Sequence, residues 1–168
     1  RRFRVPSLGI GSFSVVERNP TTTSRYFLAL LPLHLVFKVA MKHPPEALRS
    51  AKLFDSGCGY LVVTRFKADG RVEAGFFLLD VFCLGVKDAG FHRFSSVADY
   101  QESLLDRLFH DEDPVRMTPA AARKLAEDAV SYARGLGFSP GLDYKKASRV
   151  FGGITTADCD EEFVFGKD

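Results

Sequence analysis

Five side chains able to bind a metal or to transfer a proton follow one another in residues 80–92. Asp80, Cys83, Lys87, Asp88 and His92 come at and just after the end of an apolar run, GFFLLD. Such a run is typical of a buried strand, and loops that follow strands often carry functional side chains. This segment is therefore the first candidate for an active site.

Asp80 has two interpretations, because a buried carboxylate needs a hydrogen-bond or ionic partner. In the first it is a metal ligand or general base, with Asp88 or Asp143 as a second acid. Two acids that converge on a divalent cation can support phosphodiester hydrolysis. In the second interpretation Asp80 is structural, and accepts backbone amides or pairs with Lys87 or Arg65. The second is the commoner role for such an acid.

The hydrolase interpretation assigns catalysis to Asp80, Asp88 and His92, with a divalent metal as cofactor and its ligands left open. Cys83 and His92 are an alternative pair, a thiolate with its base. Cysteine is one of the most often buried residue types, and Cys83 follows an apolar run. An inert thiol is therefore favoured.

The three cysteines argue against a zinc ribbon or finger, because Cys58, Cys83 and Cys159 lie far apart and form no CxxC pair. Free thiols at such spacing are typical of a reducing compartment, and we expect a cytoplasmic protein.

The basic residues define a second candidate surface. The chain holds 23 basic and 21 acidic residues, and this balance argues against a dedicated nucleic-acid-binding protein. Local clusters can still neutralise phosphates. An accessory nucleic-acid-binding role would use Arg2 and Arg4 near the beginning of the sequence, with Lys145, Lys146 and Arg149 near its end.

A hairpin is the clearest structural element. Residues 60–66 and 71–83 are rich in apolar and β-branched residues, and Asp69-Gly70 between them is a turn signal. Residues 76–79 are apolar without alternation, which predicts a central strand covered on both faces.

Helical patterns dominate the second half. Apolar spacing predicts a helix over 97–109, and Thr118-Pro119 begins a second helix with an N-cap residue and a proline at the first position. A third helix is expected after Asp143, ending at Gly152-Gly153. The weaker patterns predict a short helix over 46–54 and a final strand over 161–165.

Strands followed by helices indicate an α+β fold, with an antiparallel sheet built around the central hairpin and helices packed on one face. We expect residues 1–25 to form an arm or weak strand. Residues 26–168 form a single domain, with the hairpin at 60–83 and the helical part at 97–152. The apolar segment 26–41 is shorter than the roughly 20 residues that cross a bilayer, so no transmembrane segment is expected.

The aromatic content favours a protein-interaction module of a larger cytoplasmic complex. The chain has 16 Phe, 5 Tyr and no Trp, and rings without a polar group fill a core or cover a partner. A Phe-rich surface or segment 26–41 would bind a protein partner or a second copy of the chain. The metal-dependent hydrolase and the nucleic-acid-binding accessory protein are the alternatives.

Two segments, GFFLLDVFCLGVKDA and YARGLGFSPGLDYKKASRVFGGI followed by CDEEFVFGKD, resemble an uncharacterised prokaryotic protein family. The resemblance covers roughly residues 59–168. It implies that the hairpin and the helices form one unit, and that the natural chain continues beyond Asp168. It assigns no catalytic residue.

Overall fold

The computed structural model describes residues 44–157 and 159–167. The chain divides into two units, Arg1–Val39 and Ala40–Asp168, and every described residue belongs to the second. The arm expected over 1–25 and the apolar segment 26–41 lie outside the described residues. Among the residues that are described, no helix has the length and apolar character needed to cross a membrane.

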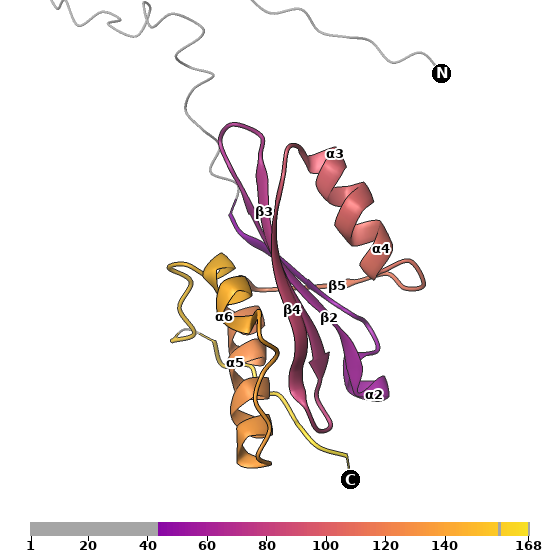
Figure 1. Ribbon diagram of the computed structural model, residues 1–168, viewed down its shortest axis with the longest axis vertical. Helices are drawn as coiled ribbons and strands as arrows, with labels where there is room; N and C mark the ends of the chain where they lie inside the picture. The colour runs from indigo at the N-terminus through magenta and orange to yellow at the C-terminus, as the bar shows by residue number, and fades with distance from the viewer. Residues whose placement is uncertain (1–43, 158, 168) are drawn as a thin grey trace, which may run out of the picture. The chain divides into compact units, whose positions relative to one another are not determined.

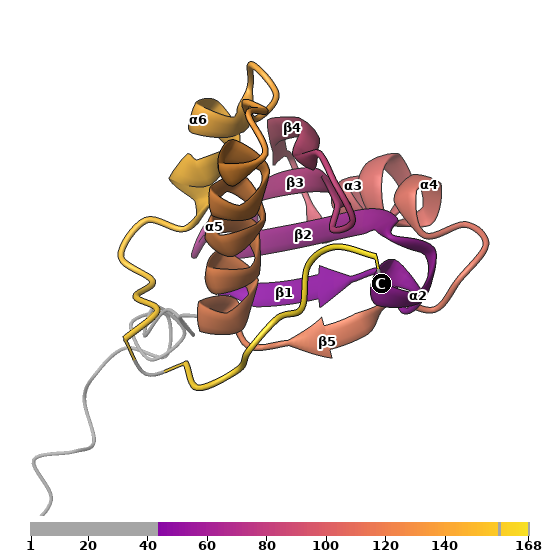
Figure 2. The same cartoon turned by 90° about the horizontal axis from the view of Figure 1, so that it is seen from below.

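A five-stranded antiparallel sheet forms the centre of the second unit (Figures 1 and 2). Its strands are β1 (Glu46–Arg49), β2 (Cys58–Phe66), β3 (Val72–Asp80), β4 (Gly85–Phe94) and β5 (Val115–Met117), in the order β4-β3-β2-β1-β5. The predicted hairpin is β2–β3, and its turn places Gly70 at a φ of 85°, a value that glycine adopts without strain.

The predicted helices are present. They are α3 (Val97–Tyr100), continued by the π-helical turn η1 (Gln101–Leu105) and α4 (Asp106–Leu108), then α5 (Pro119–Gly135), α6 (Tyr144–Ala147) and the 3₁₀ turn η2 (Ser148–Val150). Ser96 caps α3 by accepting the Asp99 amide, and Thr118 caps α5 by accepting the Ala121 amide. These polar residues satisfy amides that have no partner within the helix.

The α+β class is confirmed, and the helices lie on both faces of the sheet rather than on one (Figure 1). Helices α5 and α6 cover the face that carries Leu61 and Phe77. The segment α3–α4 covers the opposite face, where Tyr100 and Leu104 pack on Val62. Both faces are covered because the central strands carry apolar side chains on each side.

A buried polar pair joins α3 to the sheet. The Tyr100 and Thr64 hydroxyl groups lie 2.7 Å apart, and both side chains are buried. Burial raises the pKa of Tyr100 to about 12, because the charged phenolate would be poorly solvated there.

Small residues set how closely α5, α6 and η2 approach the face of the sheet that carries Phe77. A Cβ on Gly75 of β3 would lie 2.6 Å from Cγ1 of Val150 and 2.9 Å from the Ala147 carbonyl oxygen. A Cβ on Gly85 would lie 2.7 Å from the Cβ of Ala133. The alanine-rich stripe predicted for α5 is buried, as these short distances require.

The weaker sequence patterns gave wrong elements. Residues 46–54 form β1 and then the short helix α2 (Leu53–Ser56), instead of one helix. Ala47 and Leu48 enter opposite cores, which is the alternation of a strand, and β1 pairs with both β2 and β5. The segment after Cys83 is not a loop but strand β4, and β5 was not expected at all.

Residues 161–165 form no strand. Side-chain contacts hold this segment instead: the Phe163 ring stacks on Phe54 with 6.0 Å between centroids, and Phe165 stacks on Tyr132 at 5.4 Å. The apolar residues that suggested a strand are thus explained by aromatic packing.

We expect Gly75→Ala to lower the free energy of unfolding by about 1–3 kcal/mol, because the added methyl group overlaps Val150 and the Ala147 carbonyl. Gly153→Ala is the matched control, since nothing lies within 4 Å of a Cβ at that position. Urea unfolding of both variants measures the difference. Equal midpoints would show that η2 does not pack on β3 as closely as described.

Candidate interaction surface

Asp80 stabilises the turn between β3 and β4. Its Oδ1 atom accepts the backbone amides of Phe82 and Cys83 at 3.2 and 2.9 Å. Two turn donors are therefore satisfied by one carboxylate. This is the geometry of the structural interpretation, in which Asp80 bonds backbone amides.

Asp88 and His92 lie on β4. Asp88 pairs with Leu78 in the register, and its Oδ1 atom accepts the Ala89 amide at 2.9 Å. His92 is exposed and stacks on Phe76, with 5.7 Å between ring centroids. In the β3–β4 pair, His92 lies toward the end opposite to Asp80.

The register separates these candidate catalytic residues. His92 pairs with Ala74, six residues before Asp80, and a strand rises by about 3.3 Å per residue, so His92 and Asp80 are about 20 Å apart. The same spacing keeps His92 away from Cys83, which lies in the turn. Asp80 and Asp88 both lie near the turn between β3 and β4. Asp143 precedes α6 and makes no side-chain cap.

In residues 44–157 and 159–167, no group of three or more His, Cys, Asp and Glu side chains could hold a metal ion. The hydrolase interpretation, with Asp80, Asp88 and His92 as its catalytic residues, stays a prediction.

Lys145, Lys146 and Arg149 are all exposed on α6 and η2. No salt bridge joins them to an acid within the described part of the chain. Arg2 and Arg4, the other half of the predicted nucleic-acid surface, lie outside the described residues. A nucleic-acid surface made by both basic clusters together stays a prediction.

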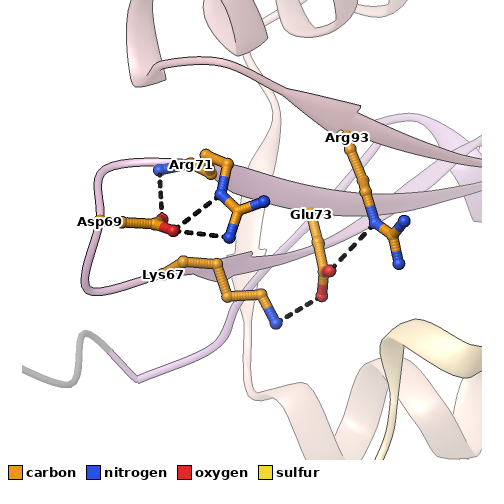
Figure 3. A network of polar contacts seen from close by, with 5 residues as sticks. All are labelled: Lys67, Asp69, Arg71, Glu73 and Arg93. Carbon is orange, nitrogen blue, oxygen red and sulfur yellow. Dashed lines mark hydrogen bonds and ion pairs between the residues drawn. The ribbon is translucent and has the colours of Figure 1, made fainter.

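Charged side chains near the β2–β3 turn neutralise one another (Figure 3). The Lys67 ammonium lies 2.6 Å from Glu73 Oε2, and Arg93 Nε lies 3.2 Å from Glu73 Oε1. The hydrogen bond from Lys67, followed by the charges of both cations, lowers the pKa of Glu73. Beside it, the hydrogen bond from Arg71 lowers the pKa of Asp69. These acids stabilise the hairpin and are already paired with cations.

A loop between α5 and α6 presents apolar side chains to solvent. We call residues 136–142 the apolar loop. Its Leu136, Phe138 and Leu142 side chains are 51%, 41% and 103% exposed. They make up three of the six exposed large apolar residues in the described part of the chain. Large apolar residues gathered on a surface often mark a site that binds another molecule.

The backbone of the apolar loop is fixed at both ends. At the end of α5 the Phe138 and Gly137 amides bond to the carbonyl groups of Ala133 and Arg134, which is a Schellman motif with Gly137 at a φ of 90°. At the other end the Gly141 amide donates to the Val86 carbonyl at 2.9 Å. The apolar loop therefore lies beside β4, and its side chains are held outward by an anchored backbone.

The sequence predicted a Phe-rich surface, and the structure places most described phenylalanines in or against the cores. Phe138 is the one phenylalanine among the large exposed apolar residues that the structure describes. Its signal was the presence of large apolar residues inside a Gly/Pro-rich loop, LGFSPGL, where no helical or strand period would bury the side chains.

Comparison of the chain with known proteins gives no match to a family model, to a curated protein or to a solved structure. The resemblance to a prokaryotic family stays a prediction.

We expect Asp80→Ala to lower the free energy of unfolding by about 1 kcal/mol, because two turn amides lose their acceptor. Asp80→Asn should retain most of the stability, since its amide oxygen can still accept. Urea unfolding of the two variants separates these effects. Equal losses would mean that the negative charge of Asp80, rather than its acceptor atom, matters.

The lowered pKa of Glu73 makes the ion-pair contribution depend on pH. Because the folded protein releases this proton more readily than the unfolded chain, the stabilisation is present above the ordinary pKa of Glu and is lost as the pH falls through the folded value. Glu73→Gln should therefore cost up to about 1 kcal/mol near neutral pH, where water screens the pairs, and progressively less as the pH falls below the ordinary pKa of Glu.

The control for Glu73→Gln is Glu102→Gln, at an exposed position on η1. Urea unfolding at a series of pH values measures both variants. A cost of Glu73→Gln that did not shrink in acid would contradict the ion-pair explanation.

Proposed function

We propose that this chain is a protein-interaction module and that the apolar loop is its binding surface. The observation that carries the proposal is the exposure of Leu136, Phe138 and Leu142 within one anchored loop. A partner that covered them would remove apolar surface from water, the main favourable term in most protein association.

The anchored backbone supports the same proposal. Ordering a mobile segment on binding costs conformational entropy, and a fixed one avoids most of that cost. The Schellman motif at Gly137 and the Gly141–Val86 hydrogen bond already hold the loop before a partner arrives. Its side chains can therefore bind without a folding step.

The charged residues favour this function over the hydrolase. Oδ1 of Asp80 and Oδ1 of Asp88 already accept backbone amides, and the register separates His92 from Asp80. The nucleic-acid alternative has support from the exposed Lys145, Lys146 and Arg149, which lie on a neighbouring element. It lacks a described second cluster on which a nucleic-acid backbone would be held, whereas the apolar loop is complete in itself.

A photo-crosslinking amino acid at position 142 tests the proposal in cells that express the full chain. We expect a covalent adduct with a protein, because Leu142 is the most exposed of the three side chains of the proposed surface. The combination Leu136→Ser with Phe138→Ser should lower the adduct yield, since it removes the remaining apolar contact area.

Position 97 provides the control site for the crosslinker. Val97 is 53% exposed at the start of α3, so it is comparable in exposure to Leu136 and Phe138 but belongs to another element. Equal adduct yields at 97 and 142, or no protein adduct at 142, would refute the proposed function.

A further inference from the structure

Strand β4 is at one edge of the sheet, and its hydrogen bonds show which backbone groups point away from β3. The Ala89 amide bonds to the Asp88 side chain, and the Val86 carbonyl accepts the Gly141 amide. Each group thus has a partner outside β3, which places both groups on the side of β4 that faces away from β3. Alternation along an antiparallel strand then directs the backbone groups of Phe91 and Arg93 outward as well.

Within the part of the chain that the structure describes, a loop covers the beginning of this edge and no strand pairs with the rest of it. A Cβ on Gly141 would lie 2.8 Å from the Lys87 carbonyl oxygen, so the loop passes beside Val86 and Lys87. From Ala89 to Arg93, no other strand of residues 44–157 and 159–167 pairs with β4. Among the described strands, residues 89–93 of β4 therefore pair on one side only, and we call this segment, beside the apolar loop, the open edge. Such edges accept a further strand through main-chain hydrogen bonds.

We propose that the open edge of β4 binds the same edge of a second copy of this chain, antiparallel and with Gly90 of each copy on the two-fold axis. Ala89 of one copy then pairs with the partner's Phe91, and the other outward groups pair reciprocally. Because opposite residues in an antiparallel pair share a face of the sheet, Asp88 lies opposite the partner's His92. This inference rests on the proposed function, that the chain is an interaction module, and adds a second copy of the chain as a partner at the neighbouring strand edge.

The side chains of β4 suit this register. Asp88 and His92 are both exposed, and a histidine opposite a carboxylate donates a hydrogen bond or forms an ion pair. The small Ala89 side chain leaves room for the larger Phe91 of the partner on the opposite strand. A slip by two residues would place Asp88 opposite the partner's Phe94, and lose the polar pair.

The Asp88 carboxylate also explains how the edge is protected before pairing. It accepts the outward amide of Ala89 at 2.9 Å, which gives this donor a partner within the monomer. On dimer formation the amide passes to the carbonyl of the partner's Phe91, and the carboxylate turns to the partner's His92. One local hydrogen bond is exchanged for two between copies.

Sedimentation velocity of the full chain, over a range of concentrations and with a thiol reductant present, tests the inference. We expect a reversible dimer. His92→Glu places like charges opposite Asp88 at two symmetric positions, and should raise the dissociation constant about tenfold or more. Asp88→Lys combined with His92→Glu restores opposite charges, and should return it to within about threefold of the native value.

Val97→Glu is the control for added negative charge, at an exposed site on α3. It should leave the dissociation constant unchanged. Hydrogen exchange provides a second readout that charge effects alone would not move: the Phe91 amide should become protected as the concentration rises, because in the dimer it donates to the partner strand.

A monomer at all concentrations would overturn the inference. So would a dimer whose dissociation constant is unchanged by His92→Glu, or a dimer in which the Phe91 amide stays unprotected. The crosslink at position 142 separates the two proposals. A monomer that still forms an adduct with a different protein would overturn only the β4 pairing. A monomer without any protein adduct would overturn the proposed function as well.

Discussion

The fold depends on strand β3, which carries apolar side chains on both faces of the sheet. Phe77 and Leu79 of β3 enter the core beneath α5, while Val72 and Ala74 enter the core beneath α3. Exposing either side would leave a large apolar area in water. Both faces of the sheet must therefore be covered, and the chain provides a helical segment for each (Figure 2).

The helix contacts in turn position the proposed binding surface. Close approach of α5 and η2 to the sheet needs small residues, and Gly75 and Gly85 supply them. Once α5 lies against β4, its last turn brings the following loop to the sheet edge, where Gly141 bonds to Val86. The apolar loop and the open edge of β4 are neighbours for this reason. Two surfaces of different chemistry, one apolar and one made of backbone groups, are thereby presented side by side.

The polar residues mostly have structural partners. Asp80 accepts turn amides, Glu73 pairs with Lys67 and Arg93, and Thr64 bonds to Tyr100 (Figure 3 for the ion pairs). Surface ion pairs contribute little each, but those of Glu73 and Asp69 act together at the β2–β3 turn. A side chain engaged in this way is a poor candidate for catalysis. In the described part of the chain, the groups left for a partner include the apolar side chains of the loop after α5, the edge of β4 and the exposed cations of α6 and η2.

The sequence by itself determined the elements that carry local signals. Asp69-Gly70 specifies the hairpin turn, Thr118-Pro119 begins α5, and the β-then-α order indicates the α+β class, because these signals act within a few residues. Only the tertiary structure decided that residues 46–49 pair as a strand, that β4 follows Cys83, and that Asp80 turns to backbone amides. Strand pairing joins residues distant in the chain, and short apolar runs fit a helix or a strand equally well. The direction of a carboxylate depends on which amides the folded backbone brings to it.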